Sequence, residues 1–226
     1  MLIKTIIFDF GNVVGFFDHW QACGVLTGFG SCTAEDIYGF CFNNELEVDL
    51  EAGRIKPEDF LELLRRQFGL KAADDELAHA FGDIFRPNED VIALLPRLKP
   101  SYRLLLGSNT SILHSRHFKQ QFAEALGYFD ALVLSHEIGA RKPQPGFYEH
   151  CLTLSQCPPN QCVFIDDMPA NVAGAQACGL QGIVYQGIED LTAKLAGLGI
   201  DVAHPSRLSV TKIPVSHKKH KKAQKE

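Results

Sequence analysis

Side chains suited to catalysis stand at four places in this chain, each at or shortly after the end of a short apolar run. They are Asp9, the pair Ser108 and Asn109, Lys142, and the pair Asp166 and Asp167. Carboxylate oxygens are ligands for hard divalent cations such as Mg²⁺, while a lysine or a helix N-terminus binds an anion such as phosphate. Each residue alone is explained equally well as a turn residue, a helix cap or a surface charge. The pattern therefore points to a site only if the fold brings the four places together.

The apolar runs predict a parallel β-sheet. Five of them are short and nearly continuous in apolar character, as strands buried on both faces are: residues 2–8, 103–107, 131–134, 161–165 and 182–185. Helical patterns separate the later runs, at residues 111–126, 145–155 and 169–178. Alternating strands and helices favour an α/β fold with helices on both faces of the sheet. Ligands of such sheets bind beyond the carboxyl ends of the strands, which is where all four places fall.

A long helical segment separates the first two predicted strands. The patterns lie at residues 34–42, 57–68, 74–85 and 88–98, whereas a simple crossover needs only about a dozen residues. We therefore predict a helical cap domain over 17–86, inserted into a catalytic core formed by 1–16 and 87–205. Between Glu35 and Glu62 the insertion has nine acidic and two basic residues, which predicts a negative surface.

Composition and charge limit the class of protein. The chain has 226 residues, is 46% hydrophobic, and shows neither a signal peptide pattern nor an apolar run long enough to span a membrane. We expect a cytoplasmic protein without membrane contact. Its seven cysteines lack CxxC spacing, which favours reduced thiols over disulfides or a zinc site.

The net charge of −5 is unevenly distributed. Six lysines and one glutamate fall between residues 212 and 226, so the preceding part of the chain is strongly acidic. We expect residues 206–226 to form a basic, disordered tail. The acidic body argues against a nucleic-acid partner. The basic tail is the one feature that favours such a partner. The oligomeric state has no signal in the sequence.

Four segments resemble the motifs of the haloacid dehalogenase superfamily. They read FDFGNVV, LLLGSNTS, GARKPQPGFYEHCL and FIDDMPANVAGAQACG, and the resemblance covers about residues 3–185. A helical cap after the first motif is typical of its capped subfamily I. The details of motifs one and four are most similar to the branch related to α-D-glucose-1-phosphate phosphatase. The resemblance implies a Rossmann-like, three-layer α/β/α core that carries the cap.

The resemblance also implies roles for the residues above. In that family the nucleophilic aspartate, the backbone carbonyl two residues later and a motif-four aspartate bind Mg²⁺, which here are Asp9, Gly11 and Asp167. Asp166 would hold a metal-bound water or act as a second ligand. The phosphoryl group would be bound by Ser108, Asn109 and Lys142. The implied function is an Mg²⁺-dependent phosphatase for a small phosphorylated metabolite, with sugar phosphates among the candidates, acting through an aspartyl-phosphate.

One departure concerns proton transfer. Phosphatases of this superfamily usually have an aspartate where this chain has Gly11, and it protonates the leaving group. General acid–base help is worth typically about 10² to 10⁴ in rate. Three explanations stay open: Asp18 or His19 substitutes for the acid, the leaving group departs without a proton, or the enzyme is weak. Asp18 is also a good candidate for a helix cap.

Two other functions are alternatives. A haloacid dehalogenase needs neither the acid nor a metal, so Gly11 fits it, while the pair Asp166 and Asp167 argues against it. The second alternative is a non-catalytic binding protein with the same fold. We further expect Phe16 and Phe17 to form a wall of the substrate pocket, and three histidines to be surface or capping groups: His114, His117 and His136.

Overall fold

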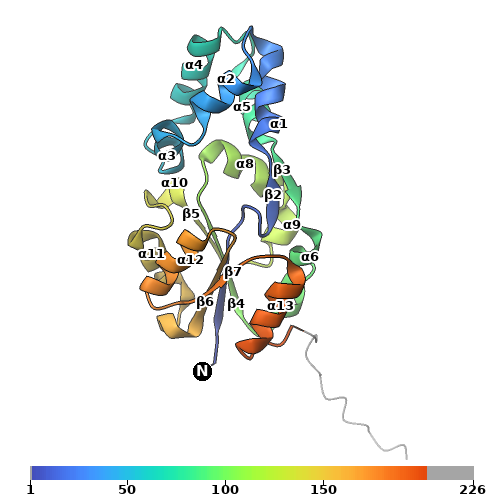
Figure 1. Ribbon diagram of the computed structural model, residues 1–226, viewed down its shortest axis with the longest axis vertical. Helices are drawn as coiled ribbons and strands as arrows, with labels where there is room; N and C mark the ends of the chain where they lie inside the picture. Colours follow the sequence, from blue (N-terminus) through green and yellow to red (C-terminus); the bar gives the residue numbers. More distant parts are fainter. Residues whose placement is uncertain (1, 203–226) are drawn as a thin grey trace, which may run out of the picture.

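The computed structural model describes residues 2–202, and a five-stranded sheet forms its centre (Figure 1). The strand order is β5 (Ala131–Leu134), β4 (Arg103–Ser108), β1 (Thr5–Phe8), β6 (Cys162–Asp166) and β7 (Gln181–Val184). Every neighbouring pair is parallel. The predicted α/β fold class is confirmed, and the strands lie within about three residues of their predicted positions.

Helices cover both faces of this sheet. Ile6 and Phe8 of β1 belong to one apolar cluster, whereas Ile7 belongs to another, because successive side chains of a strand point to opposite faces. The first cluster includes residues of α6 (Glu89–Ile92), α7 (Leu95–Leu98), α8 (Ile112–Gln121), α9 (Ala123–Leu126) and α13 (Ile188–Gly197). The second includes residues of α11 (Pro145–Ser155) and α12 (Pro169–Ala177), and α10 (Ser135–Ile138) follows β5. The core is therefore the predicted three-layer α/β/α arrangement.

Two predicted helices are interrupted. The pattern at 111–126 forms α8 and α9, with Phe122 between them in a non-helical conformation (φ −104°, ψ 22°). The pattern at 88–98 forms α6 and α7, because Pro96 has no N–H to donate to the preceding turn. The predicted helices at 145–155 and 169–178 are confirmed to within one residue.

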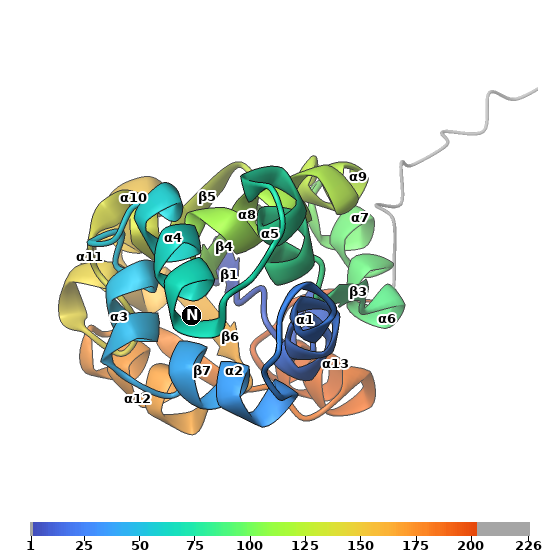
Figure 2. The ribbon, with the colours of Figure 1, turned by 90° about the horizontal axis from the view of Figure 1, so that it is seen from above.

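A helical unit stands at the carboxyl edge of the sheet (Figures 1 and 2). It consists of α1 (His19–Leu26), the 3₁₀ turn η1 (Thr27–Phe29), α2 (Ala34–Cys41), α3 (Glu45–Glu51), α4 (Pro57–Phe68) and α5 (Asp74–Gly82). It has its own apolar cluster, to which α4 contributes Phe60, Leu61 and Leu64 from one face. The antiparallel pair β2 (Gly15–Phe17) and β3 (Phe85–Pro87) connects this unit to the sheet.

The predicted domain boundaries at 16/17 and 86/87 fall within that strand pair, and the division into domains stays a prediction. The pattern at 74–85 ends as a helix at Gly82, since the chain then enters β3. The predicted tail at 206–226 lies outside the described residues. Residues 203–205, which the prediction assigned to the end of the core, lie outside them as well. Within 2–202, no helix is both long and apolar enough to cross a membrane.

Candidate active site

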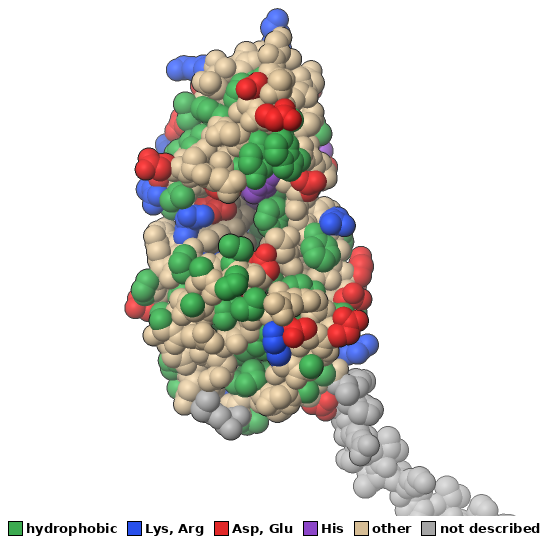
Figure 3. All heavy atoms as spheres, in the orientation of Figure 1, with side chains coloured by type: hydrophobic (Ala, Val, Ile, Leu, Met, Phe, Trp, Pro, Cys, Tyr) green, Lys and Arg blue, Asp and Glu red, His purple; other side chains and the backbone are tan. Residues whose placement is uncertain are grey.

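The predicted site residues meet at the carboxyl edge of the sheet. Asp9 follows β1, while Ser108 and Asp166 end β4 and β6, the two neighbours of β1. A cavity of about 380 Å³ lies beyond this edge, and Figure 3 shows a hollow between the helical unit and the sheet layers. Its lining includes Asp9, Gly11, Ser108, Asn109, Lys142 and Asp167.

Lys142 is the electrostatic centre of the site. Its ammonium nitrogen lies 2.6 Å from Asp9 Oδ1 and 2.7 Å from Asp166 Oδ2. All three residues are buried, with exposed fractions of 4%, 6% and 0%. Because a buried charge without a partner is very costly, this contact fixes both carboxylates relative to the lysine.

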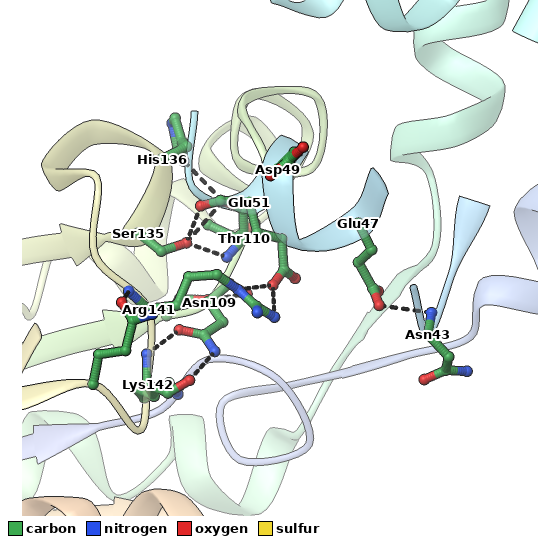
Figure 4. A network of polar contacts seen from close by, with 12 residues as sticks. Asn43, Glu47, Asp49, Glu51, Asn109, Thr110, Ser135, His136, Arg141 and Lys142 are labelled. Carbon is green, nitrogen blue, oxygen red and sulfur yellow. Dashed lines mark hydrogen bonds and ion pairs between the residues drawn. The ribbon is translucent and has the colours of Figure 1, made fainter. Parts of the chain in front are cut away.

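Asn109 holds the segment that carries the lysine. The backbone N–H of Lys142 donates to Asn109 Oδ1 (2.8 Å), and Asn109 Nδ2 donates back to the Lys142 carbonyl oxygen (3.0 Å), as Figure 4 shows. Asn109 was predicted to bind substrate. Its side-chain amide positions Lys142, and the residue lines the cavity, so its role in binding substrate stays a prediction.

Three carboxylates form a group with the spacing of a metal site. One oxygen from each of Asp9, Asp166 and Asp167 lies within 4.8 Å of the others. In the ionised state these residues and Lys142 leave two negative charges uncompensated. An all-oxygen donor set with that charge fits a hard divalent cation.

The hydrogen bonds distinguish the two adjacent aspartates. Asp166 accepts bonds on both oxygens, from Lys142 on Oδ2 and from Asn171 Nδ2 and the Met168 N–H on Oδ1 (2.9 Å each). Asp167 is half-buried, and its Oδ2 accepts a hydrogen bond from Asn12 Nδ2 (3.0 Å). Asp167 therefore keeps more lone pairs for a metal ion than Asp166 does.

Burial opposes the ionisation of this cluster. The pKa of Asp9 is raised to about 8, mainly by burial. The charge of Lys142 lowers this pKa, whereas the charges of Asp166 and Asp167 raise it. Burial also raises the pKa of Asp167. Burial lowers the pKa of Lys142, but the charges of Asp9 and Asp166 raise it by more. The pKa of Lys142 is therefore raised, and the side chain stays charged.

Phe17 occupies the space beside Gly11. A Cβ atom built on Gly11 would lie 2.9 Å from Phe17 Cε1, closer than carbon atoms pack. Phe17 lines the cavity as predicted. Phe16 does not line it, and the prediction was wrong: its ring lies 5.0 Å from the guanidinium of Arg86, because successive residues of β2 face opposite sides.

Asp18 is the cap of a helix. Its Oδ1 accepts a hydrogen bond from the Trp20 N–H (2.9 Å) at the start of α1, and it is not among the residues that line the cavity. The structure therefore gives no support to Asp18 as a substitute acid. His19 does line the cavity, with its ring stacked on Phe42 at 3.9 Å.

The prediction that His114 is a surface or capping group was wrong. It is 7% exposed, lines the cavity and stacks on Phe81 at 4.7 Å. Its Nε2 has no hydrogen-bond partner within the part of the chain that is described. Phe118 lies four residues later on the same face of α8 and is fully buried. The spacing of His114 to this apolar residue could have indicated that His114 faces inward.

The other two histidines differ from each other. His136 has a buried side chain, with Nδ1 3.0 Å from the Thr110 carbonyl oxygen, so the surface prediction was wrong for it as well. His117 lies at the junction of α5 and α8, where its Nε2 is 3.1 Å from Asp83 Oδ1.

The helical unit adds residues that sequence reasoning missed. Glu47 and Glu51 of α3 line the cavity, together with Tyr38 and Asn43. Arg141, beside the lysine, also lines it and donates from Nε to Glu51 Oε2 at 2.8 Å. No motif marks the acidic residues of α3, since only the folded cap brings them to the site.

Comparisons with known proteins identify the family of this chain. The family model of haloacid dehalogenase-like hydrolases matches residues 3–179. The chain is 27% identical to a D-ribitol-5-phosphate phosphatase of Bacteroides thetaiotaomicron over 80% of this chain and 90% of that protein. It is 30% identical to a sesquiterpene phosphatase of Aspergillus oryzae, over 80% of this chain and 88% of the relative.

A solved structure shares the fold. It is an enzyme of the same family from Bacteroides thetaiotaomicron, in complex with magnesium and inorganic phosphate. It superimposes with a TM-score of 0.72 at 23% identity, over 81% of this chain and 94% of that one.

Proposed function

Because this chain belongs to the haloacid dehalogenase-like hydrolases, whose relatives above are phosphatases, we propose that it is a Mg²⁺-dependent phosphatase. The substrate is a small phosphorylated metabolite, of which sugar and polyol phosphates are candidates, and the reaction proceeds through an aspartyl-phosphate on Asp9. The cytoplasmic location and the finer resemblance to α-D-glucose-1-phosphate phosphatases stay predictions.

The bridging contact of Lys142 carries this proposal. Asp9 Oδ1 is held by the ammonium nitrogen at 2.6 Å and by the Phe10 N–H at 2.7 Å. Its Oδ2 has no hydrogen bond among residues 2–202. That oxygen is the one open to the cavity, and we assign the attack on phosphorus to the Asp9 carboxylate. Lys142 also places positive charge where the transferring phosphoryl group develops negative charge.

Asp9, Asp167 and the carbonyl oxygen of Gly11 would hold the metal ion. When bound, Mg²⁺ offsets the repulsion between a carboxylate nucleophile and a phosphate dianion. Asp166 then has a different role from Asp167, since it orients Lys142 and Asn171 through hydrogen bonds on both oxygens. Ser108 is buried at the end of β4 and lines the cavity, and in this proposal its hydroxyl group donates to a phosphate oxygen.

The leaving group departs without strong help from an acid. Gly11 has no side chain to protonate it, and Phe17 occupies the adjacent space. Burial lowers the pKa of His19 to about 4 and that of His114 to about 3, so both imidazoles are neutral at pH 7. Esters with stable leaving groups, such as aryl or anomeric phosphates, should therefore react fastest.

Phosphate release from p-nitrophenyl phosphate tests the proposal. We expect release that requires MgCl₂, stops with EDTA and is lost in Asp9→Asn. Asp18→Asn is the matched control, because asparagine caps a helix about as well as aspartate does, and it should keep the activity. Metal-independent halide release from a 2-haloacid would instead identify a dehalogenase. The absence of both reactions would favour a binding protein.

A further inference from the structure

Charged groups face the cavity from both sides. Asp9, Asp167 and Lys142 face it from the sheet edge, with Asp166 behind them. Glu47 and Glu51 face it from α3, and Arg141 from the segment before Lys142. The remaining titratable lining groups are Tyr38, His19 and His114, of which the two histidines are neutral at pH 7. The two carboxylates of α3 therefore have a single cation, Arg141, beside them in the lining of the cavity.

Glu51 is the partner of that cation. Arg141 donates to Glu51 Oε2 from both Nε and a terminal nitrogen, and the two side chains are only 22% and 16% exposed. The backbone carbonyl oxygen of Glu51 also accepts from Ser135 Oγ at 2.6 Å. Figure 4 shows this junction between α3 and the loops of the sheet. The charge of Arg141 is thus compensated before any substrate enters.

Glu47 shares the charge of Arg141 with Glu51: burial raises the pKa of Glu47, while the Asn43 N–H and the charge of Arg141 lower it. It precedes Glu51 by four residues and so lies on the same face of α3. Its Oε2 accepts from the Asn43 N–H at 2.8 Å, which is its one side-chain hydrogen bond among residues 2–202, and it forms no ion pair there. In Figure 4 it extends from α3 towards Asn43, away from the pair of Arg141 and Glu51.

The position of Glu47 is fixed by local structure. Asn44 caps α3 by accepting from the Leu46 and Glu47 N–H groups at 2.9 and 3.2 Å. Asn43 adopts a left-handed conformation (φ 59°), which asparagine tolerates better than most residues, and so turns its N–H to the carboxylate. Its Nδ2 donates to the Tyr38 hydroxyl at 3.0 Å.

We propose that Glu47 determines the specificity of this site. It selects phosphate esters whose leaving alcohol offers hydroxyl donors and carries no negative charge, and it rejects those with a second anionic group. This inference rests on the proposed phosphatase function. At an effective dielectric constant of about 20, two like charges about 6 Å apart disfavour binding by about 100-fold.

The test compares two inhibitors of p-nitrophenyl phosphate hydrolysis. Glycerol 1-phosphate has a neutral diol as leaving group, and 3-phosphoglycerate is similar in size but adds a carboxylate. For the wild type we expect an inhibition constant about 100-fold lower for glycerol phosphate. In Glu47→Gln the difference should shrink to less than about 10-fold, mainly because 3-phosphoglycerate binds better.

Two further variants separate charge from structural damage. Glu47→Asp keeps the negative charge and should keep most of the discrimination. Glu45→Gln makes the matched change on the exposed side of the same helix, outside the cavity lining, and should behave as the wild type does. A gain of affinity for the anionic ester in Glu47→Gln cannot come from a damaged cap.

Several outcomes would overturn the inference: equal discrimination by Glu47→Gln and the wild type, a wild-type preference for 3-phosphoglycerate, or no inhibition by either ester. Any of these with active wild-type enzyme refutes the role of Glu47 alone. A wild type that fails to hydrolyse p-nitrophenyl phosphate with Mg²⁺ refutes the proposed function itself.

Discussion

Replacing Gly11 by aspartate tests why this chain lacks the usual acid. The Cβ of Gly11→Asp would lie 2.9 Å from Phe17 Cε1 and 3.3 Å from Cδ1, whereas carbon atoms pack at about 3.5 to 4.0 Å. The ring must therefore move. Overpacking costs about 1 to 3 kcal/mol, and we expect the lower end because Phe17 is 36% exposed.

The rate on an alkyl phosphate is the assay. General acid catalysis is worth about 10² to 10⁴, but the single variant should gain less than about 10-fold, since Phe17 displaces the new carboxylate. It should also melt about 2 to 4 °C lower. Gly11→Asp combined with Phe17→Ala frees the space and should gain at least about 10-fold more, with Phe17→Ala alone as the control.

One result would show that Phe17 does not exclude an acid at this position. If Gly11→Asp alone reached the rate of the double variant with an unchanged melting temperature, Phe17 would not occupy the place of the acid. A double-mutant cycle gives the coupling directly, because the two side chains are in contact.

Three other predictions follow from the same contacts. Lys142→Met leaves the carboxylates without their cation, so the unfolding free energy should fall by about 3 to 5 kcal/mol in denaturant melts and phosphatase activity should be lost. In EDTA, the raised pKa of Asp9, about 8, means that the folded protein holds a proton that the unfolded chain releases near pH 4. Asp9 should therefore lower the unfolding free energy by up to about 2 kcal/mol as pH rises from 6 to 8, while the lowered pKa values of His19 and His114 act in the opposite direction between about pH 6 and 7. The measured quantity is the difference between the wild type and Asp9→Asn in thermal melts, which should change by that amount to the disadvantage of the wild type over this pH range. Finally, kcat/KM for aryl phosphates should exceed that for alkyl phosphates by about 10² or more, because no acid assists the leaving group; equal rates across a leaving-group series would contradict this.

The sheet edge was predictable because its signals are local. Asp9, Ser108 and Asp166 each follow an apolar run, and parallel strands place their carboxyl ends together. Lys142 falls on a loop, and its contact with both Asp9 and Asp166 needed the folded chain. The distinction between Asp166 and Asp167 needed the hydrogen bonds of the folded chain.

The cap side was not predictable for a physical reason. Glu47 lies on a helix that reaches the site only after the cap has packed, and nothing near it in the sequence marks the cavity. The sequence also named two pairs of adjacent candidates, and only the folded chain distinguishes the members of each pair. Phe17 rather than Phe16, and His19 rather than Asp18, face the site because β2 and the first turn of α1 set their directions.

The central claim is that Asp9 attacks phosphorus. Mass spectrometry of the protein after rapid acid quench during turnover with Mg²⁺ tests it most directly. We expect a phosphate adduct on the peptide that contains Asp9, absent in Asp9→Asn. Full turnover with no adduct on this peptide, or an adduct on another residue, would contradict it.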